Sequence, residues 1–166
     1  MPYTERQLQS VLWEKLCKSM PLIVPNFSPE DWFECDVWGL TNSGMSWEFE
    51  IKVARADFRK DASKAPGSLF TAGHRIRRST MDSKYSRLAS GDYHGPNNFA
   101  YVAPQGVIPI DEVPVWAGLW EYTPEDGLIK TLKAQRLHKS LVPALEVDRA
   151  RRVVLYRYWN SIRTHA

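Results

Sequence analysis

Hydrophobic and polar residues repeat with two different periods along the chain, and these periods separate helices from strands. In residues 4–19 the apolar side chains share one narrow stripe at about 100° per residue, formed by Leu8, Leu12 and Leu16. This spacing predicts an amphipathic helix, with Thr4 as its N-cap. A second helical pattern over residues 144–163 predicts a helix that closes the chain.

Between these helices, apolar and polar residues alternate with a period of two, as is typical of half-buried strands. Residues 32–40 and 46–53 alternate in this way around a turn at residues 42–44. The pattern predicts a hairpin with one buried face. On its second strand the apolar face is expected to carry Trp47, Phe49, Ile51 and Val53, and the polar face Glu48, Glu50 and Lys52.

The rest of the chain reads as short elements separated by turns. A short helix is expected over residues 57–64 with Asp57 as its N-cap, followed by a loop over residues 66–83. The later elements are a helical turn over 84–89, an inner strand over 98–103, and short strands over 107–110, 116–122 and 128–132. Since no repeat or linker interrupts them, residues 1–166 are expected to form one α/β domain with helices flanking a mixed sheet.

Composition agrees with one globular domain. The chain has 166 residues, of which 43% are hydrophobic and 25% charged, and these proportions exclude disorder and collagen-like repeats. No apolar run reaches the ~18 residues of a membrane-spanning helix, and the N-terminus lacks a signal-peptide pattern. We therefore expect a cytoplasmic protein without membrane partners. Cys17 and Cys35 are too few for a disulfide framework and lack the paired spacing of a zinc site.

The net charge of +3 is unevenly distributed along the sequence. Residues 51–90 contain ten Lys and Arg against three Asp, whereas the remainder is net acidic. Such an excess suits a surface that faces phosphates, because each neutralised phosphate releases counterions. An ordinary solvated helix face would show the same excess, so charge alone leaves both readings open. The candidate nucleic-acid contacts are Arg55, Lys60, Lys64, Arg75, Arg77, Arg78 and Lys84.

Chemistry is concentrated on the polar face of the predicted hairpin. Lys52 follows Glu50 by two residues, so their side chains share a face, and Asp36 lies on the polar face of the preceding strand. A divalent cation could bridge Asp36, Glu50 and the backbone carbonyl of Ile51. Lys52 would then orient a water for attack on phosphorus. The alternative is a surface ladder of ion pairs across the hairpin.

The order of these residues resembles the PD-(D/E)XK nuclease superfamily. That superfamily has an acidic first helix, then Asp, then Glu-x-Lys, on a restriction-endonuclease-like αβββαβ core. The segment ERQLQSVLWEKL is similar to the first helix of archaeal Holliday-junction resolvases, whose leading Glu helps to hold metal. This match falls on Glu5, which also lies within the apolar stripe of its helix. Alternatively, Glu5 only stabilises the positive end of that helix.

A closer resemblance is to MmcB-like DNA repair nucleases and their small phage-encoded relatives. The segments EFEIKVARADFRKD and NNFAYVAPQGVIPIDEVPVWAGLWEY are similar to their Glu-x-Lys strand and later strands. The likeness runs from Glu5 to about Leu132. Cys35 stands where a Pro commonly precedes the Asp, and residues 65–82 are longer than in MmcB-like proteins, so we expect this segment to select the substrate.

The resemblance implies a deoxyribonuclease that depends on Mg²⁺ or Mn²⁺ and has DNA as its partner. Glu5, Asp36, Glu50 and Lys52 are the implied catalytic residues, and the metal ligands would be Asp36, Glu50, the Ile51 carbonyl and Glu5. A homodimer is compatible with it, because one site cuts one strand, and a phage-encoded protein would work in the host cytoplasm. The alternatives are a non-catalytic DNA-binding accessory protein on the same scaffold and a protein-binding module.

Overall fold

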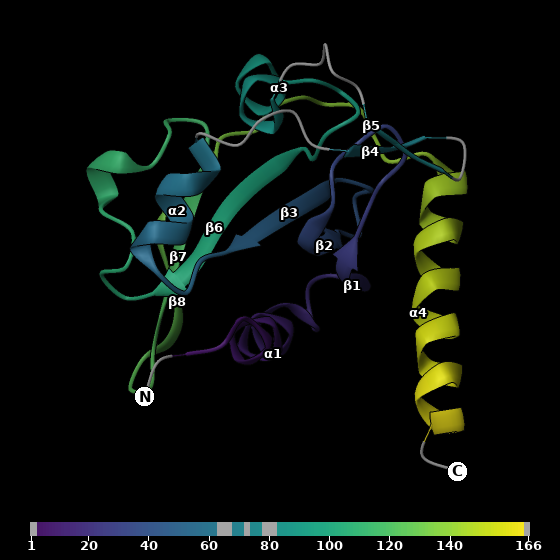
Figure 1. Ribbon diagram of the computed structural model, residues 1–166, viewed down its shortest axis with the longest axis horizontal. Coiled ribbons are helices and arrows are strands. Elements are labelled where there is room, and N and C mark those ends of the chain that lie inside the picture. The colour runs from purple at the N-terminus through teal and green to yellow at the C-terminus, as the bar shows by residue number, and fades with distance from the viewer. Residues whose placement is uncertain (1–2, 63–67, 72–73, 78–82, 165–166) are drawn as a thin grey trace.

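A six-stranded mixed sheet forms the centre of the protein (Figure 1). The structure, a computed structural model, describes residues 3–62, 68–71, 74–77 and 83–164. In spatial order the strands are β1 (Leu22–Phe27), β2 (Cys35–Leu40), β3 (Ser46–Ile51), β6 (Asn98–Pro104), β7 (Gly118–Thr123) and β8 (Gly127–Leu132). The central strand β6 runs parallel to β3 and β7, and the outer pairs are antiparallel.

Helices cover both faces of this sheet (Figure 1). They are α1 (Glu5–Leu16), α2 (Arg55–Ala62), α3 (Lys84–Ser90) and α4 (Ala144–Thr164), with a 3-10 turn at Ile110–Glu112. The apolar stripe of α1 packs on one face, against Phe49 and Trp120. On the other face, Phe58 of α2, Leu88 of α3 and Ala150 of α4 belong to one core with Tyr101.

The predicted fold class and element order are confirmed. The chain runs α1-β1-β2-β3-α2 and, after an inserted hairpin and α3, returns in β6, which is the expected αβββαβ order. Thr4 caps α1 as predicted: its Oγ1 accepts from the Gln7 N–H at 3.2 Å, and the Gln7 side chain accepts from the Thr4 N–H at 2.8 Å. Such reciprocal capping fixes where the first helix begins.

The predicted hairpin with one solvated face is wrong, because both faces are buried. On its polar face Glu48, Glu50 and Lys52 are 0%, 8% and 5% exposed. The reason is that β3 lies inside the sheet, and α2 and α3 cover the face that local alternation would leave in water. The alternation also breaks within β2, where Cys35 and Val37 belong to cores on opposite faces.

Three other local predictions are corrected. Within the expected loop over 66–83, the described residues form an antiparallel hairpin of β4 (Ser68–Thr71) and β5 (His74–Arg77). The strand expected over 107–110 is absent from the described structure, because a turn after Pro104 leads directly into the 3-10 turn. Finally, α2 begins two residues before Asp57, whose N–H already donates to the Ala54 carbonyl.

The long C-terminal helix α4 lies along the edge strand β1 and projects beyond it (Figure 1). Arg149 donates to the Ser28 carbonyl, and Arg157 donates to the carbonyls of Pro25 and Asn26. These arginines satisfy backbone acceptors at and beside the sheet edge. None of the helices in the described ranges has the length and apolar character that a membrane crossing requires.

Candidate active site

The four residues predicted to be catalytic lie together in one pocket of about 280 Å³, here called the Lys52 pocket. They come from three elements: Glu5 from α1, Asp36 from β2, and Glu50 and Lys52 from the end of β3 and the residue after it. The remaining lining residues are Ile51, Val53, Asp57 and Lys60. The fold therefore gathers residues that are up to 47 positions apart between Glu5 and Lys52.

Asp36 is fixed at the point where the β2–β3 ladder ends. The last paired residues are Val37 and Phe49, and beyond them Asp36 Oδ2 accepts from the Ile51 N–H at 2.7 Å. The side chain thus takes the place of the next ladder carbonyl. This bond orients the carboxyl group beside Glu50 and leaves Oδ1 as the oxygen that could meet a ligand.

The first helix is attached to this site by Gln9. Its Nε2 lies 3.2 Å from Glu5 Oε1, from the Asp36 carbonyl oxygen and from Asn26 Oδ1. Glu5 itself is exposed, so the apolar stripe did not bury it as the sequence pattern suggested. It occupies the outer rim of the pocket and keeps a short path to a bound cation.

A chain of alternating charges runs along the buried face of β3. Lys52 Nζ lies 2.9 Å from Glu50 Oε1, and Lys84 Nζ from α3 lies 2.9 Å from Glu50 Oε2. Lys84 Nζ also pairs with Glu48 Oε1, and the other oxygen of Glu48 accepts from Trp32 Nε1 at 2.8 Å. Buried carboxylates need such partners, because an uncompensated charge in the interior is costly.

The two carboxyl groups of the pocket have pKa values shifted in opposite directions. Burial alone would raise the pKa of Glu50, but Lys84 and Lys52 outweigh it and lower the pKa to about 2. For Asp36, burial and then the Glu50 charge raise the pKa to about 7, against the opposing effects of the Ile51 N–H and the lysines. Glu50 is therefore ionised at neutral pH, and Asp36 shares a proton with water. Such separation of neighbouring carboxyl groups is typical of functional sites.

The second half of the chain is more strongly buried. Burial alone would lower the pKa of Lys84, but Glu48 and Glu50 raise it well above its usual value. Burial raises the pKa of Glu48 although Lys84 opposes the shift, and burial together with Glu48 also raises the pKa of the Cys35 thiol. Lys84 is thus a permanent cation that links β3 to α3.

The donor set of the Lys52 pocket suits a hard divalent cation. Asp36, Glu50, Glu5 and the Ile51 carbonyl offer only oxygen ligands, which Mg²⁺ and Mn²⁺ prefer. In the described part of the chain, no three His, Cys, Asp or Glu residues form a ready-made metal cluster. Mg²⁺ does not require one, because it commonly binds one or two carboxylates and completes its shell with water and substrate phosphate.

The predicted DNA-contacting residues have diverse positions. Lys60 lines the Lys52 pocket, whereas Arg55 on α2 pairs with Glu112, as does Arg59 at 3.0 Å. Lys84 faces inward to its two glutamates. Arg75 and Arg77 lie on β5, opposite Phe70 and Ser68. Lys64 and Arg78 lie outside the described residues.

Sequence reasoning missed three contributors to the site. Glu48 was expected to be a peripheral residue of the polar face, yet it is fully buried and shares Lys84 with Glu50. Asp57 and Lys60 follow the Glu-x-Lys strand on one helical turn, and their i, i+3 spacing after that strand could have indicated them. Gln9 lies at i+4 from Glu5, which is the spacing that brings two helical side chains together.

The fold is thus of the mixed α/β class, with helices on both faces of a six-stranded sheet. A solved structure similar to this chain is that of SPO1766, a protein of unknown function from Silicibacter pomeroyi. The two share 18% sequence identity, the match covers 95% of this chain and 91% of that chain, and the TM-score is 0.63. The likeness shows the fold. The sequence matches no protein-family model and no curated protein.

Proposed function

We propose that the protein is a divalent-metal-dependent nuclease that hydrolyses DNA phosphodiester bonds, in DNA repair, recombination or phage DNA metabolism. The observation that carries this proposal is the convergence of Glu5, Asp36, Glu50 and Lys52 in one pocket. Three separate elements supply them, and an incidental ladder of ion pairs on one hairpin would not need the residue from α1. The resemblance to PD-(D/E)XK nucleases assigns the same four positions.

The roles follow from the contacts. Mg²⁺ or Mn²⁺ held by Asp36, Glu50 and the Ile51 carbonyl would polarise the scissile phosphate and favour ionisation of the attacking water. Asp36 is aligned by the Ile51 N–H, and Glu5 supports the rim of the pocket through Gln9. Lys52, held 2.9 Å from Glu50, orients the attacking water and stabilises the negative charge that develops on the phosphate oxygens.

The cations around the pocket suit a polyanionic substrate. Lys60 on α2 lines the pocket beside Lys52, so a phosphate that reaches Asp36 passes two ammonium groups. Mg²⁺ bound with the phosphate would also offset the repulsion between that phosphate and the two carboxylates. The pocket can therefore accept a negatively charged backbone despite its acidic residues.

A second function, a non-catalytic DNA-binding accessory protein, is favoured by one specific observation. Both oxygens of Glu50 already pair with lysines, at 2.9 Å each, so its charge is balanced without a metal ion. A protein that had lost turnover could retain this network for stability alone. The two functions differ in a simple way, since only the nuclease consumes its substrate.

The test is cleavage of labelled duplex, single-stranded, flap and four-way-junction DNA, in Mg²⁺ or Mn²⁺ and in EDTA. We expect metal-dependent cutting of at least one substrate, abolished by Lys52→Ala. The matched control is Lys133→Ala, which removes an exposed lysine outside the pocket and should leave the rate unchanged. Binding of DNA without cutting on every substrate would reject the nuclease and favour the accessory function.

A further inference from the structure

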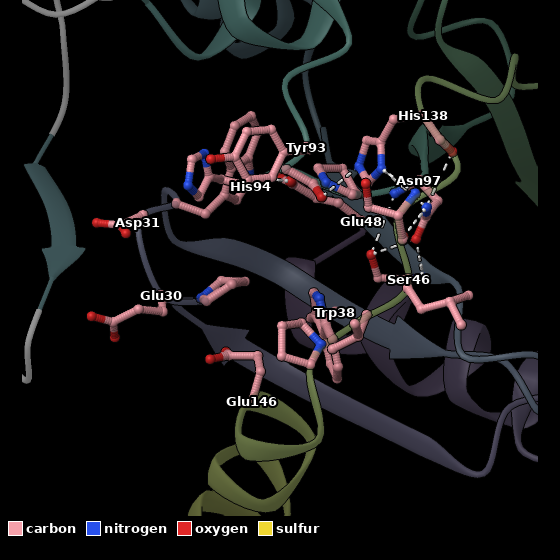
Figure 2. A pocket seen from close by; sticks show the side chains of 18 residues that line it. Glu30, Asp31, Trp38, Ser46, Glu48, Tyr93, His94, Asn97, His138 and Glu146 are labelled. Carbon is pink, nitrogen blue, oxygen red and sulfur yellow. Dashed lines mark hydrogen bonds between the residues drawn. The ribbon is translucent and has the colours of Figure 1, made fainter.

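A second pocket opens on the other side of Lys84, and none of the roles above uses it. This cavity of about 250 Å³, here called the Trp38 pocket, lies between the segment that precedes β2, the 93–97 turn and the start of α4 (Figure 2). Its floor includes Glu48, which shares Lys84 with Glu50 of the Lys52 pocket. Two residues separate Glu48 from Glu50, so the two pockets are about 7 Å apart along β3.

The charge of the Trp38 pocket is strongly one-sided. Four carboxylates line it, and no Lys or Arg is present among its described lining residues. Figure 2 shows Glu30, Asp31 and Glu146 on one side of the pocket and Glu48 on the other. Glu146 is partly neutralised by Arg149 at 2.6 Å, and Lys84 offsets Glu48 from behind. Phosphate-bearing ligands are therefore disfavoured, and cationic ones are attracted.

The walls of the pocket are aromatic. Trp32 and Trp38 are almost completely buried, and Tyr93 stands at the opening with 66% of its surface exposed, stacked on His94 at 4.0 Å. Trp32 already binds one cation, because the Arg87 guanidinium lies 4.7 Å from its ring. Aromatic faces next to carboxylates are the usual means by which proteins hold organic cations.

The floor has an acceptor without a matching donor. Glu48 Oε1 is fully buried and accepts no hydrogen bond of good geometry, although Lys84 balances its charge. The other polar groups of the floor are satisfied among themselves: Asn97 accepts from the Ser46 N–H at 2.7 Å and donates to the Ser140 carbonyl at 2.8 Å. Buried acceptors are rarely left unbonded, so this oxygen marks where an N–H donor of a ligand would point.

We propose that the Trp38 pocket binds an organic cation, a guanidinium or alkylammonium group, between its aromatic walls and its carboxylates. The cation enters past Glu30, Asp31 and Tyr93 and directs an N–H toward Glu48. The group belongs to a free small molecule or to an arginine or lysine side chain of a peptide, which share this chemistry. The site is independent of the proposed nuclease, because it requires neither metal nor DNA.

The test is an NMR titration that follows the indole N–H signals of Trp32 and Trp38 in the full chain. n-Butylguanidinium is expected to shift both signals saturably and to leave that of Trp13, which lies on α1 away from the pocket, unchanged. N-Butylurea, a neutral isostere, is expected to bind at least about tenfold more weakly, because it lacks the charge-assisted hydrogen bond. A peptide with one central arginine, compared with the free cation, reports which source binds more tightly.

Variants locate the binding. Tyr93→Ala and Glu30→Gln, both at the pocket opening, are each expected to weaken n-butylguanidinium binding at least about threefold. Glu125→Gln removes one exposed carboxylate from the β7–β8 turn and should change affinity less than twofold, about the limit of detection. Absence of saturable shifts up to about 10 mM, equal binding of the urea, or unchanged affinity in both pocket variants would overturn the proposal.

Discussion

At the scale of single residues, the Lys52 pocket keeps one carboxyl group in an unfavourable state. Asp36 is buried next to ionised Glu50, and its pKa of about 7 lies far above the ordinary value of 3.8. A group of this kind weakens the fold once the pH exceeds its unfolded pKa, because ionisation is easier in the unfolded chain. Loss of stability at a catalytic position is a common consequence of function.

Asp36→Asn should therefore stabilise the metal-free protein. The amide oxygen can still accept from the Ile51 N–H, while the repulsion from Glu50 disappears. We expect the melting temperature in EDTA to rise by at least about 3 °C at pH 8 and by much less at pH 5, since Asp36 is mostly protonated there. Asp111→Asn, at an exposed carboxylate, is the control and should change little. A variant less stable than the wild type at pH 8 would refute the assigned environment.

At the scale of elements, α3 is held to the sheet by the buried ion pairs of Lys84. Lys84→Met keeps much of the side-chain volume but leaves Glu48 without a cation and Glu50 with Lys52 alone. Breaking a buried pair in this way costs about 3–5 kcal/mol. We expect a loss of this size in urea unfolding of the single variant.

The matched double variant separates charge from packing. Adding Glu48→Gln to Lys84→Met removes the stranded carboxylate and retains an acceptor for the Trp32 indole. The double variant should recover at least half of the lost stability, because no uncompensated charge remains at Glu48. If the double variant is as unstable as Lys84→Met alone, the loss arises from packing rather than from the ion pair.

The end of α3 offers a second test at this scale. Gly91 closes the helix at φ +69°, and a Cβ there would lie 2.6 Å from the Leu137 carbonyl oxygen. Gly127 has the same φ of +69°, but a Cβ would meet nothing within 4 Å. Gly91→Ala should therefore cost more stability than Gly127→Ala, which shows only the backbone penalty of about 1–2 kcal/mol. Equal losses in chemical unfolding would argue against the close approach.

At the scale of the whole molecule, local alternation predicted the sheet but not what covers it. The positions of Asp36, Glu50 and Lys52 could be inferred because strand spacing and their order are local features. The burial of Glu48 could not, since it depends on Lys84, which is 36 residues later in the chain. The β4–β5 hairpin was missed because its Gly and Ser residues resemble loop composition.

The Trp38 pocket was beyond sequence reasoning for the same reason. Its aromatic wall, its floor and its acidic opening come from segments around residues 29–32, 46–48, 93–97 and 138–146. None of these segments has a recognisable motif, and only the complete fold brings them together. The whole molecule thus places two chemically different pockets on either side of Lys84.

The most direct measurement is the single-turnover cleavage rate of Asp36→Asn on the best DNA substrate, in Mg²⁺ or Mn²⁺, with Asp111→Asn as the control. We predict a rate at least about 10³-fold below that of the wild type from a protein that is folded and more heat-stable, and a wild-type rate for the control. Asp36→Asn activity within tenfold of the wild type, about 1.4 kcal/mol in barrier height, would contradict a metal-dependent nuclease site at Asp36.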